Sequence, residues 1–200
     1  MKKVILVFFL LSACTYAQRE TVFEGDIENG GFGGPVVKFT EVKKSFGVIV
    51  GGYGGWLINH QFLVGGGGFG LANDILADEE VTDIFGFTER PRLNFGYGGL
   101  ILEYYHDPMK LVHFSFSLLV GGGGVSYREG IFMEHSSRDN TPDAFFVLEP
   151  AVSGELNVAK FFKVGLGAGY RWASGINMPG VKNSDFSNFS INLALKFGKF

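Results

Sequence analysis

The sequence predicts an all-β protein, an antiparallel up-and-down transmembrane β-barrel of about eight strands that follows a cleaved signal peptide. Three observations predict this fold class: an apolar N-terminal leader, segments in which apolar and polar residues alternate, and connections that are alternately short and long. Alternation with a period of two puts one series of side chains on each face of a strand. Repeated along an exported chain, it is typical of a barrel with lipid outside and a polar interior.

Residues 1–17 have the features of a secretory signal peptide, with two lysines at the start, an apolar middle and small residues at the end. Two processing sites remain open. Cleavage after Ala17 would leave Gln18 as the first residue, whereas Leu11-Ser12-Ala13-Cys14 resembles a lipobox and would leave a lipidated Cys14. The apolar core before Cys14 is short, which favours cleavage after Ala17.

The amino-acid composition argues against several classes of protein and of function. The chain holds 31 glycines and 22 phenylalanines, and 46% of its residues are hydrophobic, which argues against disorder. A net charge of −3 offers no broad basic surface to a nucleic acid. The single cysteine lies in the leader. Residues 65–70 formally fit the dinucleotide-binding pattern G-x-G-x-x-G, but more strand and then a loop follow in place of the helix that such a site needs, so we expect neither a cofactor nor a metal.

The clearest alternation lies in residues 145–172, which predict two strands around a break at 157–160. We expect the other strands at 36–42, 46–56, 61–72, 93–105, 111–127 and 188–200, with tight turns at 43–45, 57–60 and 107–110 and longer loops at 73–92, 128–144 and 175–187. Residues 18–34 are expected to form a flexible, glycine-rich arm, so that the barrel domain comprises residues 35–200.

The lengths of the connections predict the two ends of the barrel. After the first hairpin they run short, long, short, long, short, long. An up-and-down barrel with both termini in the periplasm has short turns there, longer loops outside and an even number of strands. A barrel of about eight strands has an interior that side chains fill, and therefore no wide pore.

With this pattern the chain resembles the small outer-membrane β-barrel proteins of Gram-negative bacteria, of the OmpA/OmpX-like and porin-like type, over residues 35–200. The resemblance implies an integral outer-membrane location and contact with outer-membrane lipid and lipopolysaccharide. It also implies recognition of the C-terminal strand, ending at Phe200, by the barrel assembly machinery. The outward apolar series from Phe189 to Phe197 has the opposite parity to Phe200, which indicates an imperfect assembly signal or a bulge near Gly198.

A set of charged residues is expected to face the interior. Five of them form the predicted lumen network: Glu149, Glu155, Lys163, Arg171 and Lys196. Glu103 is a further candidate. The network could be a polar conduit or ligand pocket, or it could be a plug of paired charges. We favour the plug, because buried charges must be paired and eight strands leave little room.

Aromatic residues predict two girdles at the membrane interfaces. Beside the short turns these are Trp56, Phe62, Tyr104, Tyr105, Phe161 and Phe162, and nearer the long loops they are Tyr97, Tyr127, Tyr170 and Trp172. A soluble lipocalin-like barrel with an ordinary core is the rival interpretation. Outward Val, Leu and Phe on the later strands favour lipid.

These patterns lead to a structural or surface-interaction role through extracellular loops, without catalysis and with an unidentified loop partner. Transport of a small ligand through the charged interior is the alternative. A lipid-modifying esterase would depend on His113 and Ser115, which alternate on one strand face. That enzyme is disfavoured, because both residues are expected to face the interior beside a short turn, far from the outer leaflet.

Overall fold

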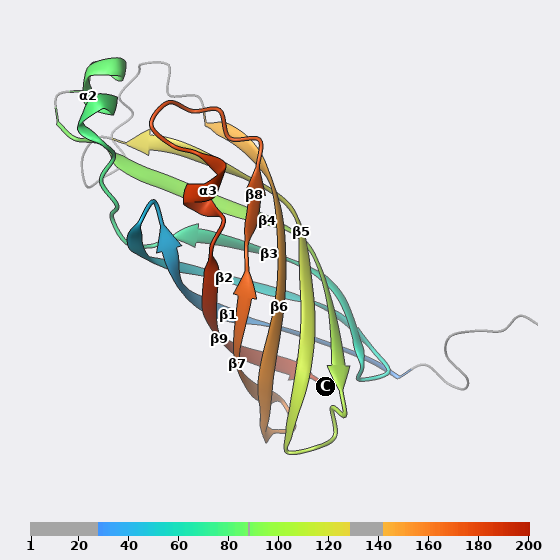
Figure 1. Cartoon of the computed structure of the whole chain (residues 1–200). Coiled ribbons are helices and arrows are strands. Elements are labelled where there is room, and N and C mark those ends of the chain that lie inside the picture. Colours follow the sequence, from blue (N-terminus) through green and yellow to red (C-terminus); the bar gives the residue numbers. More distant parts are fainter. Residues whose placement is uncertain (1–27, 88, 129–141) are drawn as a thin grey trace, which may run out of the picture.

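The computed structural model describes residues 28–87, 89–128 and 142–200, which form a closed β-barrel (Figure 1). The strands are β1 (Asn29–Val42), β2 (Ser45–Ile58), β3 (Phe62–Leu71), β4 (Arg92–His106), β5 (Val112–Arg128), β6 (Asp143–Ala159), β7 (Phe162–Tyr170), β8 (Trp172–Ser174) and β9 (Phe189–Lys199), and the short helices are α2 (Glu79–Phe85) and α3 (Asn183–Phe186). The strands pair antiparallel, and the sheet closes through β1–β9 and β5–β6. Because β7 and β8 both pair with β6, on either side of Arg171, they form one barrel strand. The predicted eight-stranded antiparallel barrel is confirmed.

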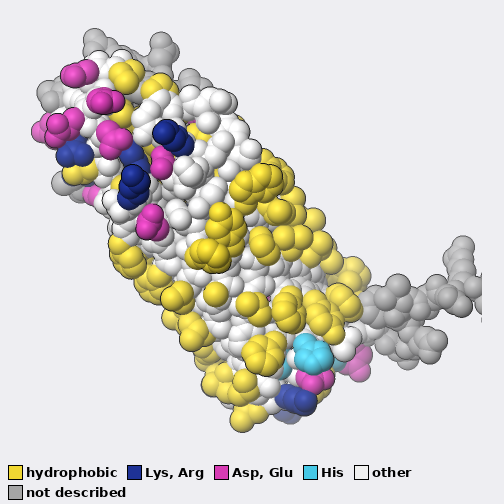
Figure 2. Space-filling model, in the orientation of Figure 1, with side chains coloured by type: hydrophobic (Ala, Val, Ile, Leu, Met, Phe, Trp, Pro, Cys, Tyr) yellow, Lys and Arg dark blue, Asp and Glu magenta, His cyan; other side chains and the backbone are white. Residues whose placement is uncertain are grey.

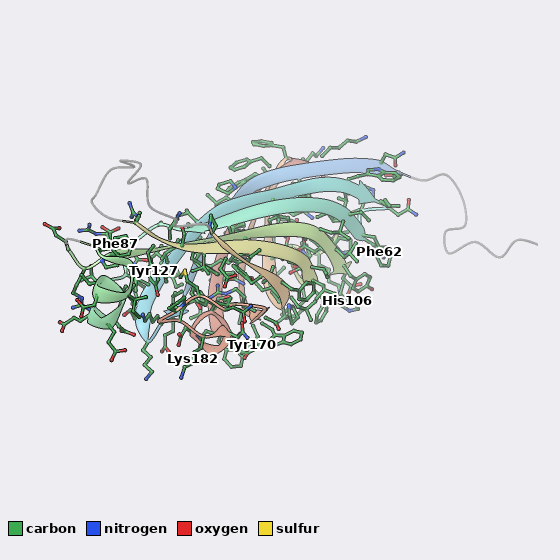
Figure 3. The ribbon with its side chains drawn as sticks, turned by 90° about the horizontal axis from the view of Figure 1, so that it is seen from above. Phe62, Phe87, His106, Tyr127, Tyr170 and Lys182 are labelled. Carbon is green, nitrogen blue, oxygen red and sulfur yellow. The ribbon has the colours of Figure 1, made fainter. Side chains whose placement is uncertain are left out.

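The connections give the barrel two different ends, which we name the turn end and the loop end. The turn end has the connections 59–61, 107–111 and 160–161, and the loop end has the connections 43–44, 72–91, 129–142 and 175–188. β1 begins and β9 ends at the turn end (Figure 1). Phe62 and His106 lie at the turn end, whereas Tyr127 and Lys182 lie at the loop end (Figure 3). The predicted sequence of short and long connections is present.

The first hairpin has the shortest connection of the loop end. Val42 pairs with Ser45, so that only Lys43 and Lys44 form the turn, and both have positive φ, 48° and 59°. Two consecutive left-handed residues give a type I′ turn, whose twist matches that of the flanking strands. Ser45, predicted as part of the turn, therefore belongs to β2.

The predicted alternation separates the two faces of the barrel wall. On β5, His113 and Ser115 are buried in the interior, whereas the intervening Phe114 faces outward and is 56% exposed. Hydrophobic side chains cover much of the wall, and the charged side chains of this view gather near the two ends (Figure 2). An apolar outer face around a polar interior is the arrangement of a barrel in lipid and speaks against a soluble one. Neither helix of the described residues is long and apolar enough to cross a membrane.

Two predicted boundaries need correction. β1 begins at Asn29, so that residues 29–34, predicted as part of a flexible arm, pair with β2 in the barrel wall. Residues 73–92, predicted as a polar loop, contain α2 and the fully or almost fully buried side chains of Ile75, Ala77 and Val81. Neither segment alternates, so periodicity gave no signal there. The predicted signal peptide, residues 18–27 of the predicted arm and most of the predicted loop at 128–144 lie outside the described residues.

The C-terminal strand keeps a single register with its neighbours. The pairs Gly31–Lys199, Phe32–Gly198 and Val37–Leu193 share one offset, so the predicted bulge near Gly198 is wrong. Phe200 packs against the core, and its ring stacks on Phe32 with the centroids 5.3 Å apart and an interplanar angle of 29°. The parity of Phe200 therefore reflects an inward-facing ring.

Glycines on β2 to β5 let neighbouring strands and interior side chains lie close to the backbone of the wall. A Cβ on the inward-facing Gly55 would lie 2.4 Å from the Gly65 Cα, and one on Gly123 would lie 2.4 Å from the Phe145 ring. Outward-facing Gly68, by contrast, has no heavy atom within 4 Å of its ideal Cβ position. Close approach of backbone and rings requires glycine at these inner positions, and a Cβ on the outward-facing Gly54 or Gly98 would likewise lie 2.5 Å from a backbone oxygen of the neighbouring strand.

We expect Gly55→Ala to lower the free energy of unfolding by about 1–3 kcal/mol, since its methyl group would collide with the backbone of β3. Gly68→Ala is the matched control and should leave stability unchanged or slightly higher. Urea unfolding of the refolded protein in phospholipid vesicles measures both. Equal stability of the two variants would contradict this account of the inner face.

Candidate functional site: the barrel interior

All five charged residues of the predicted network lie inside the barrel. Glu149, Glu155, Lys163, Arg171 and Lys196 are at most 4% exposed, and Glu103 is equally buried. They do not form one network. The loop-end cluster consists of Lys38, Tyr97, Glu149 and Arg171, and the turn-end cluster consists of Tyr53, Glu103, Tyr105, Ser115, Glu155 and Lys196.

The loop-end cluster is built around the carboxylate of Glu149. Lys38 Nζ pairs with Glu149 Oε1 at 2.5 Å, and the Tyr97 hydroxyl donates to Oε2 at 2.6 Å. Lys38 Nζ also donates to the Tyr97 hydroxyl at 3.1 Å and lies 3.6 Å from the centroid of the Phe69 ring. Each oxygen of the buried carboxylate therefore has a partner. The ion pair and the hydrogen bonds offset the free-energy cost of removing this charge from water.

The turn-end cluster is built around the ammonium of Lys196, which lies between two carboxylates. Its Nζ pairs with Glu103 Oε1 at 2.8 Å and with Glu155 Oε1. The hydroxyls of Tyr53 and Tyr105 donate to Glu103 Oε2 at 2.9 and 2.8 Å, and Ser115 donates to Glu155 Oε1 at 2.7 Å. These bonds come from five strands, so the cluster ties opposite walls of the barrel together.

A small cavity separates the two clusters. Its volume is about 50 Å³, and Lys38 and Glu149 line one part while Glu103 and Lys196 line another. A cavity of this size holds only a few water molecules. The Oδ1 of Asn192, which lines it, has no hydrogen-bond partner among the described residues and offers one acceptor to such water. The interior is thus filled in its middle as well as at the clusters.

Aromatic side chains close the loop end above the loop-end cluster. Phe95 of β4 stacks on Phe145 of β6 and on Phe186 of α3, with centroids 5.4 and 4.8 Å apart. Phe186 is fully buried. We name these three rings the aromatic cap. The predicted loop at 175–187 is therefore packed into the barrel mouth through Phe186.

Arg171 connects the cap to the interior. It interrupts the barrel strand between β7 and β8, is 0% exposed, and its Nε donates to the Phe186 carbonyl at 2.6 Å. Its guanidinium carbon lies 5.1 Å from the Phe95 ring centroid, within the range of a cation–π interaction. The hydrogen bond anchors the loop that carries α3.

Four residues of the two clusters were not predicted as part of the network: Lys38, Tyr53, Tyr97 and Tyr105. Lys38 could have been found, because it lies between the outward Val37 and Phe39 and so must face inward. Its pairing with Glu149 could not, since 111 positions separate the two residues in sequence. Tyr97 and Tyr105 were instead assigned to the aromatic girdles, and Tyr53 was assigned to neither group.

The girdle prediction needs correction for three residues. Tyr97, Tyr105 and Tyr127 are at most 4% exposed and lie in the interior. Tyr104 and Tyr105 are consecutive, and neighbouring residues of a strand face opposite sides, so only one of them can face lipid. The remaining predicted residues face outward and are partly or largely exposed: Trp56, Phe62, Tyr104, Phe161, Phe162, Tyr170 and Trp172. Phe162 stacks on outward Phe197 across β7 and β9 with the centroids 4.7 Å apart.

The geometry of His113 and Ser115 does not fit an esterase. Ser115 donates its hydroxyl proton to Glu155, so no imidazole stands ready to activate it. His113 is 2% exposed, with Nε2 3.9 Å from Glu155 Oε2 and Nδ1 3.2 Å from the Lys110 carbonyl oxygen. Ser115 is therefore a member of the turn-end cluster, and His113 lies beside it.

Polar contacts at the turn end lie outside the spanning strands. Lys110 donates to Asp107 at 2.6 Å, and this hydrogen bond holds the pKa of the Asp107 carboxyl below its ordinary value. His60 is hydrogen-bonded to Glu28 at 2.6 Å. Across the residues that the structure describes, no three His, Cys, Asp or Glu side chains are grouped so as to hold a metal ion.

The barrel geometry can be compared with known proteins. No protein-family model matches the chain, and no curated protein matches it. The crystal structure of neisserial surface protein A (NspA) is similar, with a TM-score of 0.61 and 12% sequence identity over 88% of this chain and 100% of that chain. This chain has the fold of a small outer-membrane β-barrel.

Two more outer-membrane barrels match with lower TM-scores. The N-terminal β-barrel domain of Pseudomonas aeruginosa OprF has a TM-score of 0.47 and 7% identity, over 86% of this chain and 99% of that chain. Ail, the attachment invasion locus protein of Yersinia pestis, solved with the heparin analogue sucrose octasulfate, has a TM-score of 0.48 and 12% identity, over 87% and 99%. The predicted resemblance to small outer-membrane barrels is confirmed by NspA, for the fold alone.

We expect Lys196→Met to lower the free energy of unfolding by about 3–5 kcal/mol, because it leaves two buried carboxylates without their shared cation. Lys199→Met, on the exposed end of the same strand, should change stability by less than about 0.5 kcal/mol. Urea unfolding in vesicles measures both variants. If Lys196→Met unfolded at the same urea concentration as the parent, the turn-end cluster would not stabilise the barrel.

A second variant tests the anchor of the loop-end cap. Arg171→Met removes the hydrogen bond to Phe186, so the loop should open more often, and trypsin should cleave after exposed Lys182 about tenfold faster. Arg90→Met, which removes an exposed arginine of another loop, is the control and should not alter that cleavage. Mass spectrometry of a timed digest gives the rate. An unchanged rate in Arg171→Met would show that other contacts hold the loop.

Proposed function

We propose that this protein is an integral outer-membrane barrel with a structural or surface-interaction role, and that it is neither an enzyme nor an open pore. Its turn end would face the periplasm and its loop end the outside. The outward hydrophobic side chains would contact outer-membrane lipid and the fatty acids of lipopolysaccharide. Strand β9 would be the segment that the barrel assembly machinery binds, through outward residues such as Phe197, since Phe200 faces inward.

The main observation that supports this proposal is the filled interior of the barrel. Between the aromatic cap and the turn end, each cluster satisfies its central charged group with partners from several strands, and the cavity between the clusters measures only about 50 Å³. A conducting path would have to break buried ion pairs, each of which is costly to open. The alternative of transport through the interior therefore has no supporting geometry in this structure.

The loop end supplies the surface that would meet a partner. α2 and the residues beside it expose Leu76 (47%) and Ile84 (60%) among the acidic side chains of Glu79, Glu80 and Asp83. This surface is fixed in place by ion pairs to the barrel: Lys43 with Asp78 at 3.1 Å, and Arg128 with Asp74 at 2.5 Å. A preorganised surface binds a partner at a lower entropic cost than a flexible loop does.

We expect the refolded protein to show no single-channel conductance in a planar bilayer. Insertion is checked independently on a detergent gel, where the folded barrel should migrate faster before boiling than after it. Lys38→Met, which breaks the loop-end cluster, serves as a sensitised variant. Stable conductance steps in the parent protein, altered in Lys38→Met, would contradict the proposal and make transport the better hypothesis.

A further inference from the structure

The turn end of the barrel contains a second cavity, distinct from the small one between the clusters. Its volume is about 430 Å³, within the range of pockets that bind small ligands. It is lined by residues from all three turns of this end and from the C-terminal segment, among them His60, Met109, Asn157, Lys160, Lys163 and Phe200. We name this cavity the turn-end vestibule. Neither the cap nor the two clusters account for it.

Lys163 is the unusual residue of the vestibule. Its side chain is 4% exposed and still contributes to the vestibule lining. Its ammonium contacts aromatic rings, at 4.3 Å from the Phe200 centroid and 5.3 Å from that of Tyr105. Within the described part of the chain no carboxylate forms an ion pair with it. Glu155 attracts it from beyond ion-pair distance and is itself held by Lys196 and Ser115.

Within the described ranges, the other two buried lysines have ion-pair partners that Lys163 lacks. Lys38 and Lys196 each have a carboxylate at ion-pair distance, as buried ammonium groups require. Lys163 has the aromatic contacts of those lysines without the carboxylate. Lys160, exposed on the β6–β7 turn, adds a second positive charge to the same vestibule. The vestibule therefore has two positive side chains in its lining, of which Lys163 forms no ion pair among the described residues.

We propose that the turn-end vestibule binds a small organic anion, with its carboxylate or phosphate group on Lys163 and Lys160 and its apolar part against Met109 and the Phe200 ring. Met109 is 73% exposed, and Pro108 and Ala159 continue the apolar lining. Such an anion would complete the charge pairing of Lys163, and the exposed apolar surface would select organic anions over inorganic ones. This site goes beyond the proposed structural role and does not depend on it.

The test is an NMR titration of the isotope-labelled full chain, refolded in zwitterionic micelles. The probes are benzoate, phenyl phosphate and inorganic phosphate, with benzyl alcohol as the uncharged control. Benzoate or phenyl phosphate should shift the backbone amide signals of Met109, Lys160, Lys163 and Phe200, and whichever binds more tightly identifies the acid group. Inorganic phosphate should bind more weakly, and benzyl alcohol should cause much smaller shifts.

Variants assign the effect to Lys163. Lys163→Met should weaken binding about tenfold or more, Lys163→Arg should retain it, and Lys199→Met, which removes an exposed charge from the same end, should bind like the parent. Well-dispersed spectra and faster gel migration before boiling verify that each variant is folded. Equal binding of benzyl alcohol and benzoate, unchanged affinity in Lys163→Met, or no saturable shift with any probe would overturn the site while leaving the proposed barrel role intact.

Discussion

The narrow bore of an eight-stranded barrel is the constraint on which the rest of the structure depends. Every inward side chain must fit between walls that are too close to admit bulk water. A charged residue there can find a partner only on another strand. Lys38 and Glu149 meet across the interior from β1 and β6, and Lys196 meets Glu103 and Glu155 from β9, β4 and β6. These ion pairs can therefore form only when the sheet has closed into a barrel.

The same constraint explains why glycine and large aromatic residues occur together. A tyrosine can reach a carboxylate across the barrel only if the opposite or neighbouring position leaves space for its ring. Gly67 and Gly123 leave such space, since a Cβ at either would collide with the side chain of Tyr53 or Tyr97. Tyr53 then bonds Glu103, and Tyr97 bonds Glu149. The pairing of glycine with inward-facing tyrosine is thus a property of the packed interior.

Features that depend on a period of two could be predicted from the sequence, because strand geometry alone determines them. The strands, their parity and the inward direction of Glu149, Glu155 and Arg171 belong to this class. Features that depend on contacts distant in sequence could not. The division of the charges into two clusters requires the register of every strand, and the burial of Phe186 requires the path of a loop without periodicity. Phe200 depends on a period of two and was still misinterpreted. Its parity predicts an inward side chain, but a bulge near Gly198 was expected in its place.

The two ends of the barrel differ. Packed side chains close the loop end, whereas the turn end contains the open vestibule. At the loop end, Arg171 is hydrogen-bonded to the Phe186 carbonyl, so the loop that carries α3 is part of the folded core. At the turn end, short turns cannot fold back over the opening, and the interior ends at Phe200 and Lys163. A buried ammonium without an ion-pair partner is tolerable there because aromatic rings contact it and the vestibule gives it access to solvent and to soluble anions. The position of Lys163, which would be unfavourable at the centre of the barrel, is therefore consistent with binding at its edge.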